Sequence, residues 1–321
     1  MLITKLLNKV GNEMQQIIYI LPEHIKKGVT HLIEHRESSL EEIRLRLLQP
    51  VELIFRHENV WMENIIFNEQ DSRYLLNQLT EHSLYRMEHE LQEGYITIRG
   101  GHRVGLSGKV VIKNKHHIQL QQITYYNIRV AKEIMDVARP LLPYLLDNQG
   151  YQNTLLIGPP NTGKTTMIRD LARLISDGND WSERKKVAIV DERSEIAAAI
   201  HGVPQHNVGM STDVMDACPK AVGMMMMIRS MSPDVLVVDE IGRDEDVRAI
   251  NEAILSGVTI ICTIHGDSYT EVKNRPSMEQ LFEANIFTRI ITLSGVAYDE
   301  WKGNILDGRG NELTINGIEK C

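Results

Sequence analysis

The stretch LLIGPPNTGKTTMIRDLARLI, residues 155–175, decides the fold of the second half of the chain. Its centre, GPPNTGKT at residues 158–165, fits the phosphate-loop pattern G-x-x-x-x-G-K-[ST], with a strand-like apolar run before it and a helix-like pattern after it. Glycines let backbone amides curl around a β-phosphate, and the amino end of a helix adds partial positive charge. The stretch therefore predicts a nucleotide-binding loop between a strand and a helix.

The residues of this loop have expected roles in holding ATP and Mg²⁺. We expect Lys164 to reach the β- and γ-phosphates and Thr165 to supply an oxygen to Mg²⁺. A chance match in a loop is the alternative, and the flanking strand and helix patterns argue against it. The full set predicted to bind the nucleotide is Gly158, Pro159, Pro160, Asn161, Thr162, Gly163, Lys164, Thr165 and Thr166.

A second motif, DVLVVDE at residues 234–240, describes a buried strand that ends in two carboxylates. Ligands bind at the carboxyl ends of the strands in open parallel sheets. We expect Asp239 to hold Mg²⁺ through water, and Glu240 to orient or deprotonate the attacking water as a general base. A strand that merely ends in solvent-facing acids is the alternative. The phosphate loop earlier in the chain favours the functional interpretation.

A third strand end, in VAIVDERSEIAAA at residues 187–199, carries three acids. Asp191, Glu192 and Glu195 are predicted to lie near the γ-phosphate, whereas a solvated turn with a salt bridge to Arg193 is the simpler alternative. These acids also compete with Glu240 for the role of general base. We favour Glu240, with Glu192 and Glu195 positioning water and metal.

A histidine follows a further apolar strand pattern, in CTIHGDS at residues 262–268. A polar side chain at that point can hydrogen-bond the γ-phosphate and report its hydrolysis. A lone histidine at a strand end is more often a bystander, so the motif alone does not decide the role of His265.

Strand and helix patterns alternate from Glu133 onward, and short β-branched runs separated by helices indicate a parallel sheet covered on both faces. The predicted fold class is α/β, with a RecA-like phosphate-loop ATPase domain at residues 133–321 after a smaller mixed α+β domain at residues 1–132. Within the first domain we expect helices at 13–35 and 70–91, two strands within 41–56, and a β-rich block over 94–133.

Composition places the chain among soluble globular proteins. Its 321 residues are enough for two domains, 42% are hydrophobic and 24% are charged. The net charge of −8 argues against a general nucleic-acid coat or a polybasic membrane binder. The three cysteines have no metal-ligand spacing, which favours reduced thiols in the cytosol. Apolar runs fall short of a membrane-spanning helix, so we expect membrane contact only through a partner.

The order of these motifs resembles the secretion-ATPase superfamily, the hexameric motors of type II and type IV secretion. Longer segments resemble the stage III sporulation protein AA family of endospore-forming bacteria, and the resemblance covers nearly the whole chain. They are EEIRLRLLQPVELI, GYITIRGGHRVGLSGKVV, NIRVAKEI, VDERSEIAA and CPKAVGMMMMIRSMSPDVLVVDEIGR. The resemblance strengthens the roles of Asp191, Glu192, Glu195 and His265. One departure is Asp239, because secretion motors usually have glycine before the glutamate.

Basic residues gather in the otherwise acidic chain, with eight Lys or Arg and two acids between residues 94 and 139. A solvated face is the default explanation, and a nucleic-acid surface with Tyr95, Tyr125 and Tyr126 for stacking is another. The resemblance favours a third, in which arginines reach a nucleotide held by a neighbouring subunit. Arg103 and Arg129 are the first candidates.

The resemblance implies an ATP hydrolase in a homohexameric ring. It also implies a cytoplasmic, mother-cell location and a membrane-embedded secretion-type channel protein as partner, between mother cell and forespore. Nucleic acid is not the first-choice partner. A nucleic-acid-dependent ATPase that uses residues 94–139 stays open as the alternative, as does a nucleotide switch that scarcely hydrolyses ATP.

Overall fold

The computed structural model describes residues 12–80, 88–114, 117–297 and 300–313. The chain forms two compact units, the first ending at Lys132 and the second beginning at Glu133.

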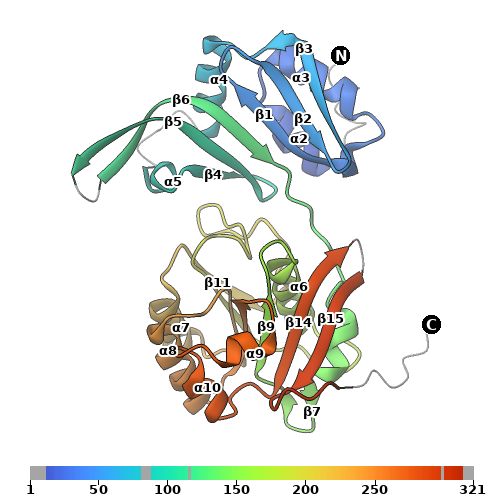
Figure 1. Ribbon diagram of the computed structural model, residues 1–321, viewed down its shortest axis with the longest axis vertical. Coiled ribbons are helices and arrows are strands. Elements are labelled where there is room, and N and C mark those ends of the chain that lie inside the picture. Colours follow the sequence, from blue (N-terminus) through green and yellow to red (C-terminus); the bar gives the residue numbers. More distant parts are fainter. Residues whose placement is uncertain (1–11, 81–87, 115–116, 298–299, 314–321) are drawn as a thin grey trace. The chain divides into compact units, whose positions relative to one another are not determined.

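The first unit is built on a six-stranded antiparallel sheet (Figure 1). Its strand order is β3 (Glu58–Ile66), β2 (Pro50–Phe55), β1 (Leu40–Arg46), β6 (His117–Arg129), β5 (His102–Asn114) and β4 (Tyr95–Ile98). The first strand expected within 41–56 is β1, in which Ile43 and Leu45 are buried while Arg44 and Arg46 keep partial exposure. Strands β5 and β6 continue as a two-stranded ribbon beyond the residues paired to β4 and β1 (Figure 1).

Helices cover the apolar face of this sheet. They are α2 (Asn12–Ile20), α3 (Glu23–Ile33), α4 (Glu69–Leu79) and α5 (Glu88–Glu93), with a 3₁₀ turn η1 at Glu37–Ser39. Buried residues of helices and strands form one core, in which Ile17, Ile25 and Leu75 join Ile43 and Val104. The opposite face of the sheet carries the polar side chains of the alternating pattern.

Two predicted helices of this unit are wrong in extent. The helix expected over 13–35 is two helices, because Pro22 has no N–H to donate and takes an extended backbone (ψ 146°) ahead of α3. The helix expected over 70–91 ends at Leu79, and a separate short helix begins at Glu88. Residues 81–87, between them, lie outside the described part of the chain.

The second unit is built on a seven-stranded sheet that is parallel except at one edge. Its strand order is β11 (Thr212–Asp216), β10 (Val187–Asp191), β12 (Val235–Val238), β13 (Thr259–His265), β9 (Thr154–Gly158), β14 (Arg289–Ala297) and the antiparallel β15 (Glu300–Asp307). A small hairpin pairs β7 (Leu146–Asp147) with β8 (Gly150–Tyr151).

Helices pack on both faces of this sheet, as the alternating pattern predicts. Helix α6 (Lys164–Asp177) and the 3₁₀ helix η3 (Arg139–Tyr144) share one core with Ile189 and Val237. The other core holds Val190 and Val238 with residues of α7 (Lys220–Met231), α8 (Asp244–Leu255), α9 (Tyr269–Lys273) and α10 (Glu279–Glu283). Neighbouring residues of one strand thus enter different cores. The helical turns expected after Glu133 are the 3₁₀ segment η3, which contains two prolines.

Parallel strands bring their carboxyl ends to one edge of the sheet. Strands β9, β10, β12 and β13 lie side by side there, so the phosphate loop, the acid-ended strands and the histidine-ended strand share that edge. Within the described residues, no helix combines the length and apolar character required to cross a bilayer.

Candidate nucleotide-binding site

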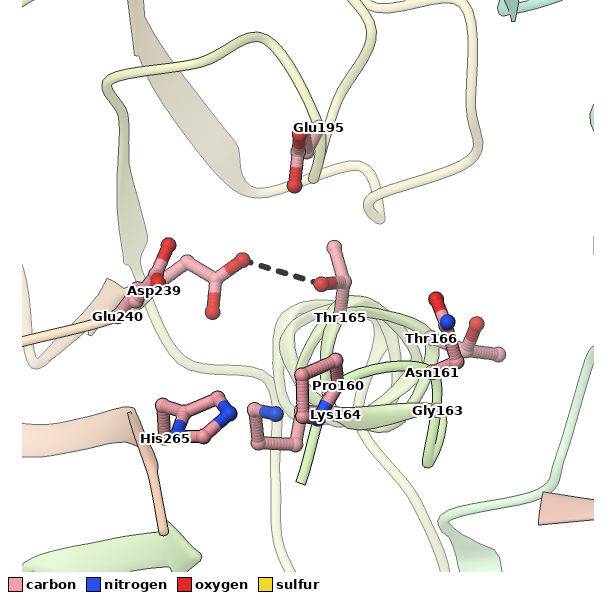
Figure 2. A pocket seen from close by; sticks show the side chains of 10 residues that line it. All are labelled: Pro160, Asn161, Gly163, Lys164, Thr165, Thr166, Glu195, Asp239, Glu240 and His265. Atoms are coloured by element: carbon pink, nitrogen blue, oxygen red, sulfur yellow. Dashed lines mark hydrogen bonds between the residues drawn. The ribbon is translucent and has the colours of Figure 1, made fainter. Parts of the chain in front are cut away.

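A pocket of about 490 Å³ opens at this edge of the second unit (Figure 2). Its wall comes from the phosphate loop, the start of α6 and the carboxyl ends of β12 and β13, with one residue from the loop after β10. The lining residues are Pro160, Asn161, Gly163, Lys164, Thr165, Thr166, Glu195, Asp239, Glu240 and His265. All ten belong to the motifs that the sequence singles out.

The phosphate loop joins β9 to α6 through a backbone that needs glycine. Gly163 precedes the first residue of α6 and has φ 85°, in the left-handed region where a side chain is strained. A Cβ atom at Gly158 would lie 2.7 Å from Thr162 Oγ1 and 2.9 Å from the Leu293 carbonyl oxygen. The first residues of α6 line the pocket, so the amino end of the helix faces it. The N–H groups of a helix's first turn have no partner within the helix, and they can bind an anion there.

Lys164 is folded back on its own loop. Its Nζ donates to the carbonyl oxygens of Gly158 (2.7 Å) and Pro159 (2.8 Å). Burial of the ammonium lowers the pKa of Lys164, and the carboxylates of Asp239 and Glu240 oppose that shift. A nucleotide phosphate can replace the two carbonyl acceptors with a stronger, charged one.

Thr165 and Asp239 meet at the centre of the pocket, where the Thr165 hydroxyl donates to Asp239 Oδ2 (3.1 Å; Figure 2). The second carboxylate oxygen, Oδ1, accepts from the hydroxyl of Thr263. Hydroxyl and carboxylate oxygens are the donors that Mg²⁺ prefers, so these two residues fit the metal of a magnesium–nucleotide complex. Thr263 was missed by sequence reasoning. Its only signal in the sequence is a threonine inside the apolar run of residues 260–264, and the structure buries it fully.

Glu240 follows Asp239 in a constrained backbone. Its φ of 53° lies in the left-handed region, and its N–H donates to Thr263 Oγ1 (2.8 Å). Its carboxylate lines the pocket and also forms an ion pair with Arg193, with Arg193 Nη1 2.6 Å from Glu240 Oε2. The sequence pattern offers Arg193 only as a salt-bridge partner for the acids beside it, whereas the structure pairs it with Glu240.

The three acids at the end of β10 and in the loop after it make different contacts. Only Glu195 lines the pocket, on the side opposite Lys164 and His265 in Figure 2. The carboxylate of Glu192 pairs with the ammonium of Lys220 in α7. Asp191 and Glu192 are not among the pocket residues, so of the three acids only Glu195 faces the pocket directly.

Asp191 organises the loop that carries Glu195. Its carboxylate accepts the backbone N–H groups of Glu195 (2.8 Å), Ile196 (2.9 Å) and Ala197 (2.9 Å). Burial raises the pKa of Asp191 to about 6, even though these hydrogen bonds act in the opposite direction. Buried Arg169 of α6, which sequence reasoning did not single out, donates to the carbonyl oxygens of the same loop at Glu195 and Ile196.

His265 stands at the end of β13, where it is exposed and lines the pocket near Lys164 (Figure 2). Arg103 and Arg129 belong to the first unit, where they are register partners on β5 and β6. The guanidinium of Arg103 lies 3.4 Å from the centre of the Tyr95 ring, and Arg129 Nε lies 3.7 Å from Glu42 Oε1. The position of both arginines relative to a nucleotide stays a prediction.

Fold and site together define a phosphate-loop protein in which a RecA-like domain follows an antiparallel-sheet domain along the chain. Two solved structures share this fold. The X-ray structure of the Yersinia pseudotuberculosis ATPase DotB matches with a TM-score of 0.60 at 14% identity, over 90% of this chain and 81% of that chain. The crystal structure of the pilus retraction motor PilT with bound ADP matches with a TM-score of 0.58 at 14% identity, over 90% and 83% of the two chains.

The family is shown by sequence. The family model described as sporulation stage III, protein AA, matches residues 11–313. Stage III sporulation protein AA of Bacillus subtilis (strain 168) is 46% identical over 309 residues, which covers 96% of this chain and 100% of that protein. This chain belongs to the sporulation stage III protein AA family, and the resemblance seen in its motifs is confirmed.

Proposed function

We propose that this chain hydrolyses ATP with Mg²⁺ and serves as the motor of a secretion-type channel. The observation that carries the proposal is the convergence of Lys164, Thr165, Asp239 and Glu240 on one pocket. These side chains supply a phosphate-binding cation, two metal-binding oxygens and a carboxylate for water, which are the parts that phosphoryl transfer to water needs.

The chemistry assigned to the site is attack of water on the γ-phosphorus. The bond between this phosphorus and the β,γ-bridging oxygen breaks, and ADP and inorganic phosphate are released. Glu240 accepts the proton of the attacking water, and Lys164 moves from the carbonyls of its loop to the phosphates. Thr165 and Asp239 would hold Mg²⁺, which would supply positive charge to the phosphate oxygens when bound.

Supporting roles follow from the contacts of the remaining residues. Glu195 and His265 face the pocket from opposite sides, which suits them to position water and to contact the γ-phosphate. Asp191 and Glu192 act on the site through the loop, Asp191 by binding its amides and Glu192 by pairing with Lys220. We therefore propose these two as positioning residues.

The motor assignment rests on the family and the shared fold. We propose a homohexameric ring in the cytoplasm of the mother cell. The ring would dock onto a membrane-embedded channel protein that faces the forespore. Arg103 and Arg129 are proposed to act on the nucleotide of a neighbouring subunit. Their register pairing places both on one face of the sheet, as a joint contact with phosphate requires.

A nucleic-acid-dependent ATPase is less favoured by the contacts of the basic region. Arg129 lies 3.7 Å from Glu42, and Arg139 Nη2 lies 2.5 Å from Asp180 Oδ2. Acidic partners of this kind reduce the positive potential that a phosphate backbone requires.

The experiment that tests the proposal is the steady-state ATPase rate across a range of protein concentrations, with and without single-stranded DNA. Lys164→Ala provides the blank, because it removes the phosphate-binding ammonium. A specific activity that rises with protein concentration and does not respond to DNA supports the ring motor. Stimulation by DNA favours the nucleic-acid-dependent ATPase instead. Hydrolysis by Lys164→Ala at the wild-type rate refutes the assignment of the site.

A further inference from the structure

One ion pair joins the proposed general base to a residue outside the pocket. Arg193 Nη1 lies 2.6 Å from Glu240 Oε2, and the two residues come from the ends of neighbouring strands, β10 and β12. Glu240 lines the pocket, so the guanidinium is one side chain away from the space that a γ-phosphate needs.

We infer that Arg193 is a positioning residue that holds Glu240 in the nucleotide-free site and exchanges it for the γ-phosphate when ATP binds. The inference rests on the proposed function and adds to it a means of telling ATP from ADP. The inference requires that the loop carrying Arg193 is held in place. It also requires that the ion pair between Arg193 and Glu240 opens easily.

The two residues that flank Arg193 are both held by side-chain contacts to neighbouring elements. Glu192, before it, pairs with Lys220 of α7. Ser194, after it, has φ 51° and donates from Oγ to Asp216 Oδ1 (2.6 Å) on β11. Two neighbouring elements therefore hold the loop at the residues that flank Arg193.

The following residues connect the loop to the phosphate-binding helix. Arg169 of α6 donates through Nη2 to the Glu195 carbonyl oxygen (2.7 Å), and Asp191 accepts the Glu195 N–H (2.8 Å). Helix α6 begins at Lys164, so the loop of Arg193 and the phosphate loop are parts of one bonded framework. This framework holds the origin of the Arg193 side chain in place relative to the phosphate loop.

Glu240 is fixed at its backbone as well. Its N–H donates to Thr263 Oγ1 (2.8 Å), and the same hydroxyl donates to the carboxylate of Asp239. Exchange of partners can therefore proceed by side-chain rotation while the backbone of Glu240 stays bonded to Thr263.

The ion pair itself is easily opened. The side chains are 59% and 43% exposed, and ion pairs exposed to that extent contribute little to stability because water competes for both charges. A phosphate offers a guanidinium two parallel charge-assisted hydrogen bonds and more negative charge than one carboxylate. The γ-phosphate of ATP thus outcompetes Glu240 for Arg193, whereas ADP has no γ-phosphate and leaves the pair closed. Release of Glu240 then coincides with the arrival of the phosphate that water attacks.

The test compares affinities for fluorescent ADP and a fluorescent non-hydrolysable ATP analogue, both with Mg²⁺. Arg193→Ala is expected to lower affinity for the ATP analogue about tenfold, the loss of one charge-assisted contact, and to leave ADP affinity unchanged. Arg193→Lys retains part of the preference for ATP because it retains the charge. The matched control is Arg36→Ala, which removes an exposed ion pair of the same 2.6 Å length, Arg36–Glu58, from the first unit.

Glu240→Gln gives a second readout that does not depend on Arg193→Ala. It removes the competing charge at nearly constant shape, so the ATP analogue should bind more tightly than to wild type while ADP binds equally. In the double variant this gain should disappear, because it acts through Arg193.

Three results overturn the inference. The first is an unchanged ratio of ATP-analogue affinity to ADP affinity in Arg193→Ala. The second is an equal loss of affinity for both nucleotides, which indicates a merely structural role. The third is a Glu240→Gln gain that persists without Arg193. Failure of the wild-type chain to bind either nucleotide refutes the proposed function as well, so the two failures are distinguishable.

Discussion

Thr165 and Asp239 are 74 residues apart in the chain and meet through a 3.1 Å hydrogen bond from the Thr165 hydroxyl to Asp239 Oδ2. The bond joins the phosphate loop to the acid-ended strand at the point where a magnesium–nucleotide complex needs both oxygens. The hydroxyl uses its proton in this bond and keeps its oxygen lone pairs, so Thr165 could ligate a metal ion while it still donates to Asp239.

The first prediction concerns this pair. Thr165→Ser keeps the oxygen and should keep Mg²⁺-dependent hydrolysis. Thr165→Val keeps the shape without the oxygen and should weaken activation by Mg²⁺ by at least about tenfold, since even indirect supports of metal ligands matter that much. Magnesium titration of the ATPase rate checks this, with ADP binding in EDTA as the control for an intact pocket. Equal Mg²⁺ dependence in the valine variant would contradict the assignment.

The sequence predicted those parts of the second unit that depend on local pattern. GPPNTGKT predicted the loop and α6, and the apolar run of DVLVVDE predicted strand β12, because both carry a strong signal over a few consecutive residues. The alternating helices and strands predicted the parallel sheet and hence the edge at which the motifs meet.

The parts that the sequence did not predict depend on contacts between distant residues. Thr263 supports Asp239 and Glu240, and Arg169 supports the loop of Glu195, but neither interrupts a motif in a way that signals this. The different contacts of Asp191, Glu192 and Glu195 could not be predicted for the same reason, since Lys220 lies 28 residues from its partner Glu192. The break at Pro22 could have been read from the sequence, because proline lacks the N–H that a continuing helix uses.

The second prediction concerns the arginines of the first unit. Arg103→Ala or Arg129→Ala should lower the concentration-dependent ATPase rate about 10³-fold if the residue stabilises transition-state charge in a neighbouring subunit. ADP binding to the isolated chain should be unaffected. Lys109→Ala, which removes an exposed charge from the same strand as Arg103, is the control for a general electrostatic effect. Wild-type rates in both arginine variants would remove these residues from the mechanism.

The third prediction follows from the raised pKa of Asp191, about 6 against a usual value of 3.8. The folded chain binds this proton more strongly than the unfolded chain, so the stabilisation is complete below about pH 4 and is lost as pH rises through 6. The full difference corresponds to about 3 kcal/mol. In urea unfolding followed by circular dichroism, the wild-type free energy of unfolding should fall relative to that of Asp191→Asn between pH 4 and pH 7. Asp213→Asn, on an exposed side chain of β11, is the control for the loss of a surface carboxylate. A difference in the free energy of unfolding between wild type and Asp191→Asn that stays constant from pH 4 to pH 7 would contradict the prediction.

The last prediction separates the two glutamates of the pocket. Glu240 and Glu195 both line it, but Glu240 is held at the end of β12 beside Asp239, while Glu195 approaches from the opposite loop (Figure 2). If Glu240 is the general base, Glu240→Gln should lower the hydrolysis rate about 10²- to 10⁴-fold. ATP should remain bound, because the residues that hold its phosphates are intact. Glu195→Gln should lower the hydrolysis rate by a smaller factor, since it removes a group that positions the attacking water but does not accept its proton. Single-turnover hydrolysis and retention of radiolabelled ATP measure the two effects separately. A larger loss of hydrolysis in Glu195→Gln than in Glu240→Gln would move the general base to the loop after β10.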